Sequence, residues 1–186
     1  MSSSSERPDS TRRQIRFAIG ECALGSLLVA VGERGVCAIT LGDNPEALAA
    51  DLLDRFPEGQ RVLDDPEVGQ ALAQLVSFIE APTLGLELRL DVRCTAFQQR
   101  VWQALREIPM GAKASYAEIA RRVGSPKAVR AVAGACAANS LALAIPCHRV
   151  VRSDGSLSGY RWGMARKAEL LRRESIASLP REPEEA

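Results

Sequence analysis

Short apolar runs separated by turn residues dominate the first part of the chain, a pattern typical of β-strands. Residues 15–19, 26–31 and 36–41 are each short and apolar, and Gly32-Glu33-Arg34-Gly35 favours a hairpin turn between the last two runs. Residues 86–90 alternate apolar and charged positions, which predicts one further strand. The pattern therefore predicts a small sheet in the N-terminal part.

Helical spacing replaces strand spacing after the third apolar run. Asn44-Pro45 offers an N-cap followed by proline at the first helical position, and Pro57-Glu58-Gly59 ends the apolar period that follows. A second helix is expected after Asp65-Pro66. We expect a small α/β domain over residues 14–91, preceded by a disordered tail over residues 1–13.

The second half reads as mostly helical. Thr95 can cap a first helix, and Ser115 can cap a short helix over residues 116–123. Gly124-Ser125-Pro126 then turns the chain into a helix predicted over residues 127–138. Two short helices joined by a glycine-containing turn outline a helix-turn-helix, although any tight helical hairpin has the same outline.

Charge divides the chain in the same way. Residues 1–91 carry 8 basic and 15 acidic side chains, residues 92–176 carry 15 and 5, and residues 177–186 carry 1 and 3. A basic half predicts a polyanion partner such as nucleic acid, although an ordinary solvated surface explains most such asymmetries. We expect a second domain over residues 92–176 and a disordered tail over residues 177–186.

The composition limits where the protein can be located and which cofactors it can bind. No apolar run approaches the roughly 18–20 residues that span a bilayer, and the N-terminus lacks an apolar signal core. Five cysteines without paired spacing and a single histidine favour neither a disulfide framework nor a zinc site. The expectation is a soluble, cytoplasmic protein with reduced thiols, no metal and no membrane contact.

The only histidine of the chain, His148, directly follows Cys147. A thiol beside an imidazole is a candidate nucleophile. Neighbouring side chains of an extended segment point to opposite faces, so a water or a third residue would complete a relay. Glu174 falls on the apolar side of a final helix predicted from about residue 164 to 173, where an imidazole N–H is a suitable partner. The alternative is that the helix ends before Glu174 and leaves it solvated.

The helix predicted over residues 127–138 is rich in alanine, with Arg130 as its main long side chain. Alanine is the best helix former, and small side chains also allow close packing on a neighbouring helix. A slim helix can equally approach a narrow groove with Arg130 projecting from it. The residues alone leave both interpretations open.

The segment Pro146-Cys147-His148-Arg149-Val150 resembles the active-site signature of the methylated-DNA–protein-cysteine methyltransferases, the O6-alkylguanine repair family. The segment Gly20-Glu21-Cys22-Ala23-Leu24-Gly25 is similar to the C-terminal repair half of Ada-type proteins. The resemblance covers roughly residues 14–175. Further matching segments are residues 97–102, 115–116, 127–132, 139 and 158–163.

The resemblance implies a fold and an activity. The N-terminal part would be a ribonuclease-H-like α/β subdomain, and the C-terminal part a mostly α subdomain of winged-helix or helix-turn-helix type. Cys147 would accept an alkyl group from O6 of guanine, irreversibly and without a cofactor, with O4 of thymine as a second candidate. His148 would activate the thiol through a water and Glu174 would orient His148. The implied partner is double-stranded DNA, bound by a monomer.

The resemblance also implies binding residues. Because a stacked base cannot reach a buried thiol, the base must be flipped out at a cost of a few kcal/mol. Arg130 would fill the vacated stack from the minor groove, which favours the slim-helix interpretation. The implied substrate-binding residues are Tyr116, Asn139, Val150, Tyr160 and Arg161, and the implied DNA contacts besides Arg130 are Ser115, Lys127, Ala128 and Ala131.

Two other functions remain compatible with the residues alone. A helix-turn-helix regulator with a structural cysteine would bind a preferred DNA sequence and ignore lesions. A cysteine hydrolase would turn over many times, although its only possible base, His148, is adjacent to Cys147. By contrast, an alkyltransferase that consumes its own cysteine would act only once.

Overall fold

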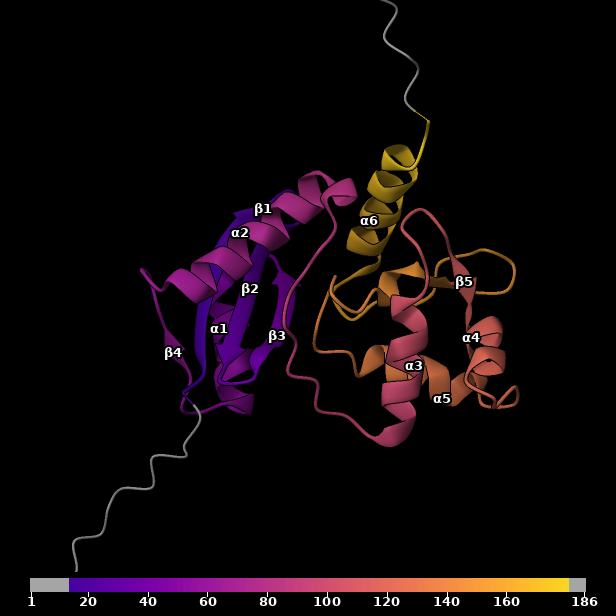
Figure 1. Ribbon diagram of the computed structural model, residues 1–186, viewed down its shortest axis with the longest axis horizontal. Helices are drawn as coiled ribbons and strands as arrows, with labels where there is room; N and C mark the ends of the chain where they lie inside the picture. Colours follow the sequence, from indigo (N-terminus) through magenta and orange to yellow (C-terminus); the bar gives the residue numbers. More distant parts are fainter. Residues whose placement is uncertain (1–13, 181–186) are drawn as a thin grey trace, which may run out of the picture.

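A four-stranded sheet forms the N-terminal half of the computed structural model, which describes residues 14–180 (Figure 1). The strands are β1 (Arg16–Cys22), β2 (Gly25–Gly32), β3 (Gly35–Gly42) and β4 (Gln60–Arg61). Their order is β3-β2-β1-β4, with β1, β2 and β3 antiparallel and β4 parallel to β1.

Two helices cover the two faces of this sheet. Both begin as predicted, because the side chains of Asn44 and Asp65 cap them and a proline follows each cap. Along β2, Leu28 packs into the cluster that includes the first helix, whereas Leu27 and Val29 pack into the larger core on the other face. Burial on both faces explains why this strand is continuously apolar. The helices are α1 (Pro45–Arg55) and α2 (Pro66–Glu80).

The other half is mostly helical. Thr95 and Gln98 form a capping box at the start of its first helix, and Ser115 caps the second. The Trp102 indole donates to the Ala135 carbonyl at 2.8 Å, which ties the first helix to the third. The elements are η1 (Pro82–Leu84), α3 (Ala96–Arg106), β5 (Ala114–Ser115), α4 (Tyr116–Arg122), α5 (Val129–Ala137), η2 (Cys147–Arg149), β6 (Val150–Val151) and α6 (Met164–Ala177).

Strand β3 lies at the edge of the sheet and contacts two segments of the rest of the chain. Val36 forms a bridge with Leu90 in the connection to α3, which runs between the two halves in Figure 1. Ile39 donates its N–H to the Ser140 carbonyl at 2.9 Å. The backbone just before Cys147 is therefore anchored to the sheet.

The mixed α/β class is confirmed, while some element boundaries differ from the prediction. The strand predicted over residues 86–90 is wrong: only Leu90 pairs with β3, because the edge of β3 is shared with the segment before Cys147. Helix α5 begins at Val129 rather than at residue 127, because the Ala128 N–H closes a turn onto the Ser125 carbonyl at 2.8 Å.

Two differences fall near the end of the chain and at the candidate nucleophile. Cys147 lies in a 3-10 turn and not in the extended segment that was predicted, since the Arg149 N–H donates to the Pro146 carbonyl. Helix α6 continues past residue 173 to Ala177, so Ala177 is helical rather than part of a tail. The predicted tail over residues 1–13 and most of the C-terminal tail lie outside the described residues.

Candidate active site

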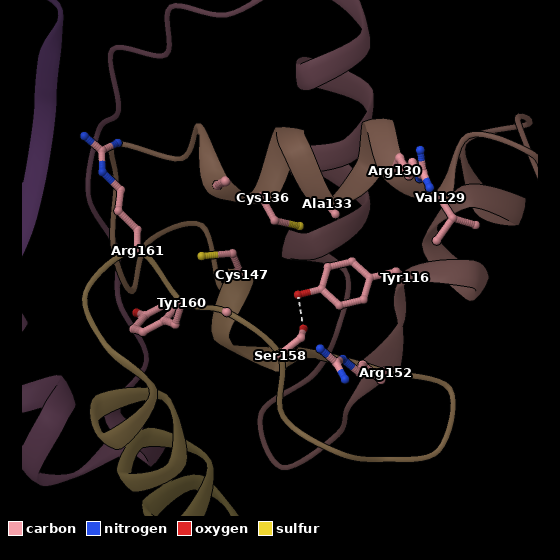
Figure 2. Close-up of a pocket in the computed structure, with 12 residues that line it drawn as sticks. Tyr116, Val129, Arg130, Ala133, Cys136, Cys147, Arg152, Ser158, Tyr160 and Arg161 are labelled. Atoms are coloured by element: carbon pink, nitrogen blue, oxygen red, sulfur yellow. Dashed lines mark hydrogen bonds between the residues drawn. The ribbon is translucent and has the colours of Figure 1, made fainter.

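A cavity of about 530 Å3 opens between α4, α5 and the loop over residues 152–161, and Cys147 lies in its wall (Figure 2). Tyr116 comes from the start of α4, Arg130 and Cys136 from α5, and Arg161 from the loop. The Cys147 side chain is buried in the core yet reaches this cavity. A molecule entering the cavity would meet one thiol from η2 and one from α5.

Asn139 braces the turn that carries Cys147. Its amide nitrogen donates to the Ile145 carbonyl at 2.9 Å and to Cys147 Sγ at 3.3 Å, and its oxygen accepts the Leu141 N–H at 2.9 Å. Within this turn Leu143 adopts a φ of 71°, an uncommon value for a side chain of this kind. Such backbone strain persists only where surrounding contacts hold the residue in place. Here the buried Asn139 amide forms three hydrogen bonds.

A buried polar cluster lies behind Cys147. His148 Nε2 lies 2.8 Å from Glu174 Oε1, and both side chains are essentially inaccessible, at 0% and 1% exposed. Arg149 donates to the two oxygens of Glu174 at 3.0 and 2.9 Å and to the Ile108 carbonyl at 2.7 Å. The helix that could have ended before Glu174 continues past it. The structure thus brings His148 and Glu174 together.

The cluster fixes the protonation states of its members. Burial alone would raise the pKa of Glu174, but hydrogen bonds from His148 and Arg149 outweigh it and lower the pKa to about 2. Glu174 is therefore an ionised acceptor, so Nε2 of His148 carries the proton between them. Burial lowers the pKa of His148 against the opposing effect of Glu174, which keeps the imidazole neutral. Its other nitrogen, Nδ1, is buried and lacks a hydrogen-bond partner among the described residues.

The thiol itself is held in the neutral form. Burial raises the pKa of Cys147, against the opposing hydrogen bond from Asn139 and the positive charge of Lys167. Burial also raises the pKa of Cys136, to about 12. Neither thiol is a thiolate at neutral pH, so reaction at Cys147 requires a base. The unpaired imidazole nitrogen of His148 can serve as that base.

Three residues of the site were missed by sequence reasoning. Arg149 was quoted only as part of a motif, yet it is the main partner of Glu174. Lys167 is fully buried and donates to the Ser158 carbonyl at 3.1 Å. Ser158 in turn donates to the Tyr116 hydroxyl at 2.6 Å. A signal for Lys167 existed, because it precedes Glu174 by seven residues on one face of α6.

The remaining candidates for substrate binding fall around the cavity. Tyr160 lines it and packs edge-on against Trp162, with ring centroids 5.2 Å apart. The Arg161 guanidinium donates to the Asn139 carbonyl at 3.1 Å and lies over the Trp162 ring. Val150 is buried in β6, directly after η2. The side chain of Val150 does not line the cavity; the expected contact involves its backbone.

The candidates for DNA contact lie on the surface around α5. Arg130 and Ala131 are exposed on the first turn of α5, and Lys127 is exposed in the turn before it. Ala128 is the residue that precedes the helix, and Ser115 accepts the Glu118 N–H as the cap of α4. Arg130 also lines the mouth of the cavity that contains Cys147. The exposed face of α5 and the thiol are therefore neighbours.

Within residues 14–180, no helix is long and apolar enough to cross a membrane. Among the same residues, no three His, Cys, Asp or Glu side chains are grouped in a way that could hold a metal ion.

These features define a class: an α/β protein that presents two buried thiols to an open cavity, with a histidine–glutamate pair behind one of them, Cys147, and a pair of short helices beside the cavity. The family model described as 6-O-methylguanine DNA methyltransferase, DNA binding domain, matches residues 96–176. The chain is 44% identical over 123 residues to the methylated-DNA–protein-cysteine methyltransferase of Mycobacterium leprae, covering 64% of this chain and 74% of that protein. The chain belongs to the methylated-DNA–protein-cysteine methyltransferase family.

Two further relatives agree with this assignment. The bifunctional transcriptional activator/DNA repair enzyme Ada of Escherichia coli is 53% identical over 161 residues, which are 87% of this chain and 46% of that protein. The chain therefore spans about half the length of that relative. The crystal structure of Mycobacterium tuberculosis OGT in complex with DNA superposes with a TM-score of 0.74 at 32% identity, covering 87% of this chain and 94% of that one. The family resemblance stated from the motifs is confirmed.

Proposed function

We propose that this protein repairs alkylated DNA by moving an alkyl group from O6 of guanine to Sγ of Cys147. The bond between O6 and the alkyl carbon breaks and a carbon–sulfur bond forms, so each molecule acts once. The observation that carries the proposal is the buried Cys147 thiol in the wall of an open cavity, backed by an imidazole with one unpaired nitrogen. O4-alkylthymine is a second candidate donor.

His148 supplies the base. The thiol proton passes through a bridging water to Nδ1 of His148, which the buried site leaves without another partner. The imidazolium that results is stabilised by Glu174, whose lowered pKa of about 2 keeps it charged. Asn139 donates to the sulfur, which supports the negative charge that develops there before attack.

Groups around the cavity bind the base and stabilise the leaving guanine. As the carbon–oxygen bond breaks, negative charge accumulates on the purine, and donors aimed at it lower the barrier. We assign this role to the Tyr116 hydroxyl and the backbone N–H of Arg161, and recognition of the exocyclic amine to the Val150 carbonyl. Tyr160 lines the cavity and would contact the base. No cofactor is needed, because the lesion itself is the alkyl donor.

Double-stranded DNA is the proposed partner, with the target base flipped into the cavity. The exposed face of α5 would lie in the minor groove, and Arg130 at the mouth of the cavity would fill the vacated stack. The relative from Mycobacterium tuberculosis was crystallised with DNA, which supports this partner. Further contacts are proposed for Ser115, the cap of α4, and for Lys127, Ala128 and Ala131, which are near Arg130 in the chain.

Residues 14–91 would form a ribonuclease-H-like subdomain and residues 92–176 a winged-helix or helix-turn-helix subdomain. The protein would act as a monomer in the cytoplasm, where its five cysteines, none of them in a disulfide, stay reduced.

The test is transfer of a labelled methyl group from duplex DNA that carries one O6-methylguanine. We expect about one label per protein molecule, located by mass spectrometry on the peptide that contains Cys147. Cys147→Ala should abolish transfer, whereas Cys136→Ala, which removes the other thiol of the cavity, should retain it. Labelling that continues beyond one equivalent, or that survives Cys147→Ala, contradicts the proposal.

A further inference from the structure

The hydroxyl groups of Ser158 and Tyr116 meet at the wall of the cavity. Ser158 Oγ donates to Tyr116 Oη at 2.6 Å, between residues 42 positions apart in the chain. The distance of 2.6 Å between the two oxygens lies in the usual range for a hydrogen bond between hydroxyl groups. Figure 2 shows the bond joining the loop to the phenol on the side of the cavity that faces Cys147. Because both residues line the cavity, this hydrogen bond can affect how Tyr116 contacts a molecule bound there.

We propose that Ser158 is a positioning residue, which sets the direction in which the Tyr116 hydroxyl donates. A phenol has one proton and two acceptor positions. When Ser158 donates to the phenol oxygen, the phenol proton is left for an acceptor inside the cavity. The inference rests on the proposed function, in which that acceptor is the flipped purine.

The direction of this bond matters for the reaction. Negative charge grows on the purine as the alkyl group leaves, and the Tyr116 proton can stabilise it. In a chain of hydrogen bonds each donor strengthens the next, so Ser158 donating to Tyr116 makes the phenol a better donor. If the phenol instead donated to Ser158, its proton would face away from the base and this stabilisation would be lost.

Lys167 holds Ser158 in place for this role. Its buried ammonium donates to the Ser158 carbonyl at 3.1 Å and lies 6.0 Å from the centre of the Tyr116 ring. Lys167 belongs to α6, the same helix that carries Glu174. The loop that bears Ser158 is thereby tied to the helix that orients His148. Both the phenol and the imidazole are thus positioned from one rigid element.

The experiment is a double-mutant cycle in the full chain, read as the single-turnover rate of transfer from O6-methylguanine in duplex DNA. We expect Tyr116→Phe to slow transfer about 10- to 100-fold and Ser158→Ala about three- to tenfold. In the Tyr116→Phe background, Ser158→Ala should slow transfer no further, because Ser158 acts through the phenol. Two independent, multiplying losses would overturn the proposal.

Matched variants separate this role from simple loosening of the loop. Ser156 lies in the same loop, and its exposed hydroxyl bonds to Asp154 at 2.6 Å, so Ser156→Ala should leave the rate unchanged. Ser158→Thr keeps the hydroxyl and should recover most of the rate. Loss in Ser156→Ala equal to that in Ser158→Ala, or no recovery in Ser158→Thr, would indicate a structural role only.

A readout on the free protein tests, without any reaction, whether the Ser158 hydroxyl can donate to Tyr116. Burial raises the pKa of Tyr116, and the Ser158 hydrogen bond acts in the opposite direction. With fluorinated tyrosine and 19F NMR, the two tyrosines can be followed separately. Ser158→Ala should raise the pKa of Tyr116, because the phenolate loses the hydroxyl that donates to it; no change or a fall would overturn the proposal. If the wild-type protein transfers no alkyl group, the proposed function fails, and this titration still tests Ser158.

Discussion

Two arginines of the helical half, Arg149 and Arg130, show how differently its two polar regions are built. Arg149 is 8% exposed and donates to both oxygens of Glu174 and to the Ile108 carbonyl. Arg130 is exposed on α5 and forms no ion pair or hydrogen bond with the part of the chain that the structure describes. Acceptors within the protein bind the Arg149 guanidinium. The Arg130 guanidinium has no such partner among the described residues, which fits the DNA contact proposed for it.

The difference predicts where each region contributes. A buried ion pair contributes little when intact, but removal of one partner is costly because the other charge stays buried. An exposed arginine contributes little to folding. Changes in the buried cluster should therefore alter both stability and reaction, whereas changes on α5 should alter reaction with duplex DNA alone.

The largest effect should follow Glu174→Ala. The substitution leaves the Arg149 guanidinium buried without its carboxylate and removes the acceptor of His148 Nε2. We expect the free energy of unfolding to fall by about 3–5 kcal/mol, measured by urea denaturation at neutral pH. Methyl transfer should be lost as well, because the imidazolium that forms during activation of Cys147 would have no counter-charge.

Glu169 on the same helix provides the matched control. Hydrogen bonds from Arg172 and Arg173 lower the pKa of Glu169 to about 2, as for Glu174, but Arg172 is exposed and the other two side chains are partly exposed. Glu169→Ala should therefore shift the denaturation midpoint far less. Equal shifts in the two variants would contradict the contrast between buried and exposed pairs.

Acid should remove the contribution of Glu174 from the wild-type protein. The pKa of Glu174 is about 2 in the fold and about 4.3 in an unfolded chain. The stabilisation is therefore fully present above the unfolded value and is lost as the pH falls toward 2. The difference in stability between wild type and Glu174→Ala should shrink over that range, which repeats of the urea experiment at lower pH would measure.

A smaller effect, on reaction and not on folding, is expected for Arg130→Ala. Flipping a base costs a few kcal/mol of unstacking, so loss of the side chain that fills the gap should slow transfer from duplex DNA about tenfold or more. Transfer from a single-stranded oligonucleotide with the same lesion should change little, because its base is already unstacked. The urea midpoint should stay at the wild-type value.

Arg34→Ala removes the same charge from the hairpin turn between β2 and β3, far along the chain from α5. It should leave both transfer rates unchanged. Equal slowing of Arg130→Ala on duplex and single-stranded substrates would argue against base flipping and place Arg130 in general electrostatic attraction.

The contrast between the two regions also explains what the sequence could predict. Local signals located Asn44, Thr95 and Ser115 as helix caps, because each cap bonds to backbone two or three residues away. The candidate nucleophile and its base were adjacent in a recognisable motif. Helix periodicity and the family motif pointed to Glu174 as the partner of His148, but neither pointed to the partners of Arg149 and Ser158, which only the folded core reveals.

The predicted secondary structure is wrong where tertiary contacts compete for the same backbone hydrogen-bonding groups. Residues 86–90 have the alternation of a strand, yet the edge of β3 accommodates only Leu90, since Ile39 already pairs with the segment around Ser140. Cys147 follows a proline in an apolar run that favours extended backbone, but bonds from Asn139 hold the turn before it. Sequence periodicity carries no information about either competition.

The smallest effect should follow Lys127→Ala, in the turn before α5. Lys127 is exposed and lies beside Arg130, but it does not line the cavity, so it can contact phosphate without touching the flipped base. A phosphate contact contributes equally to lesioned and intact DNA and makes binding salt-dependent. The slope of log affinity against log salt concentration should therefore fall by about 1 in Lys127→Ala.

Lys127→Arg should retain the slope, and fluorescence anisotropy with intact duplex DNA over a salt series would measure both. If Lys127→Ala instead weakened binding to lesioned DNA alone, Lys127 would belong with the base-flipping residues, and the boundary drawn between the cavity and the surrounding surface would have to move.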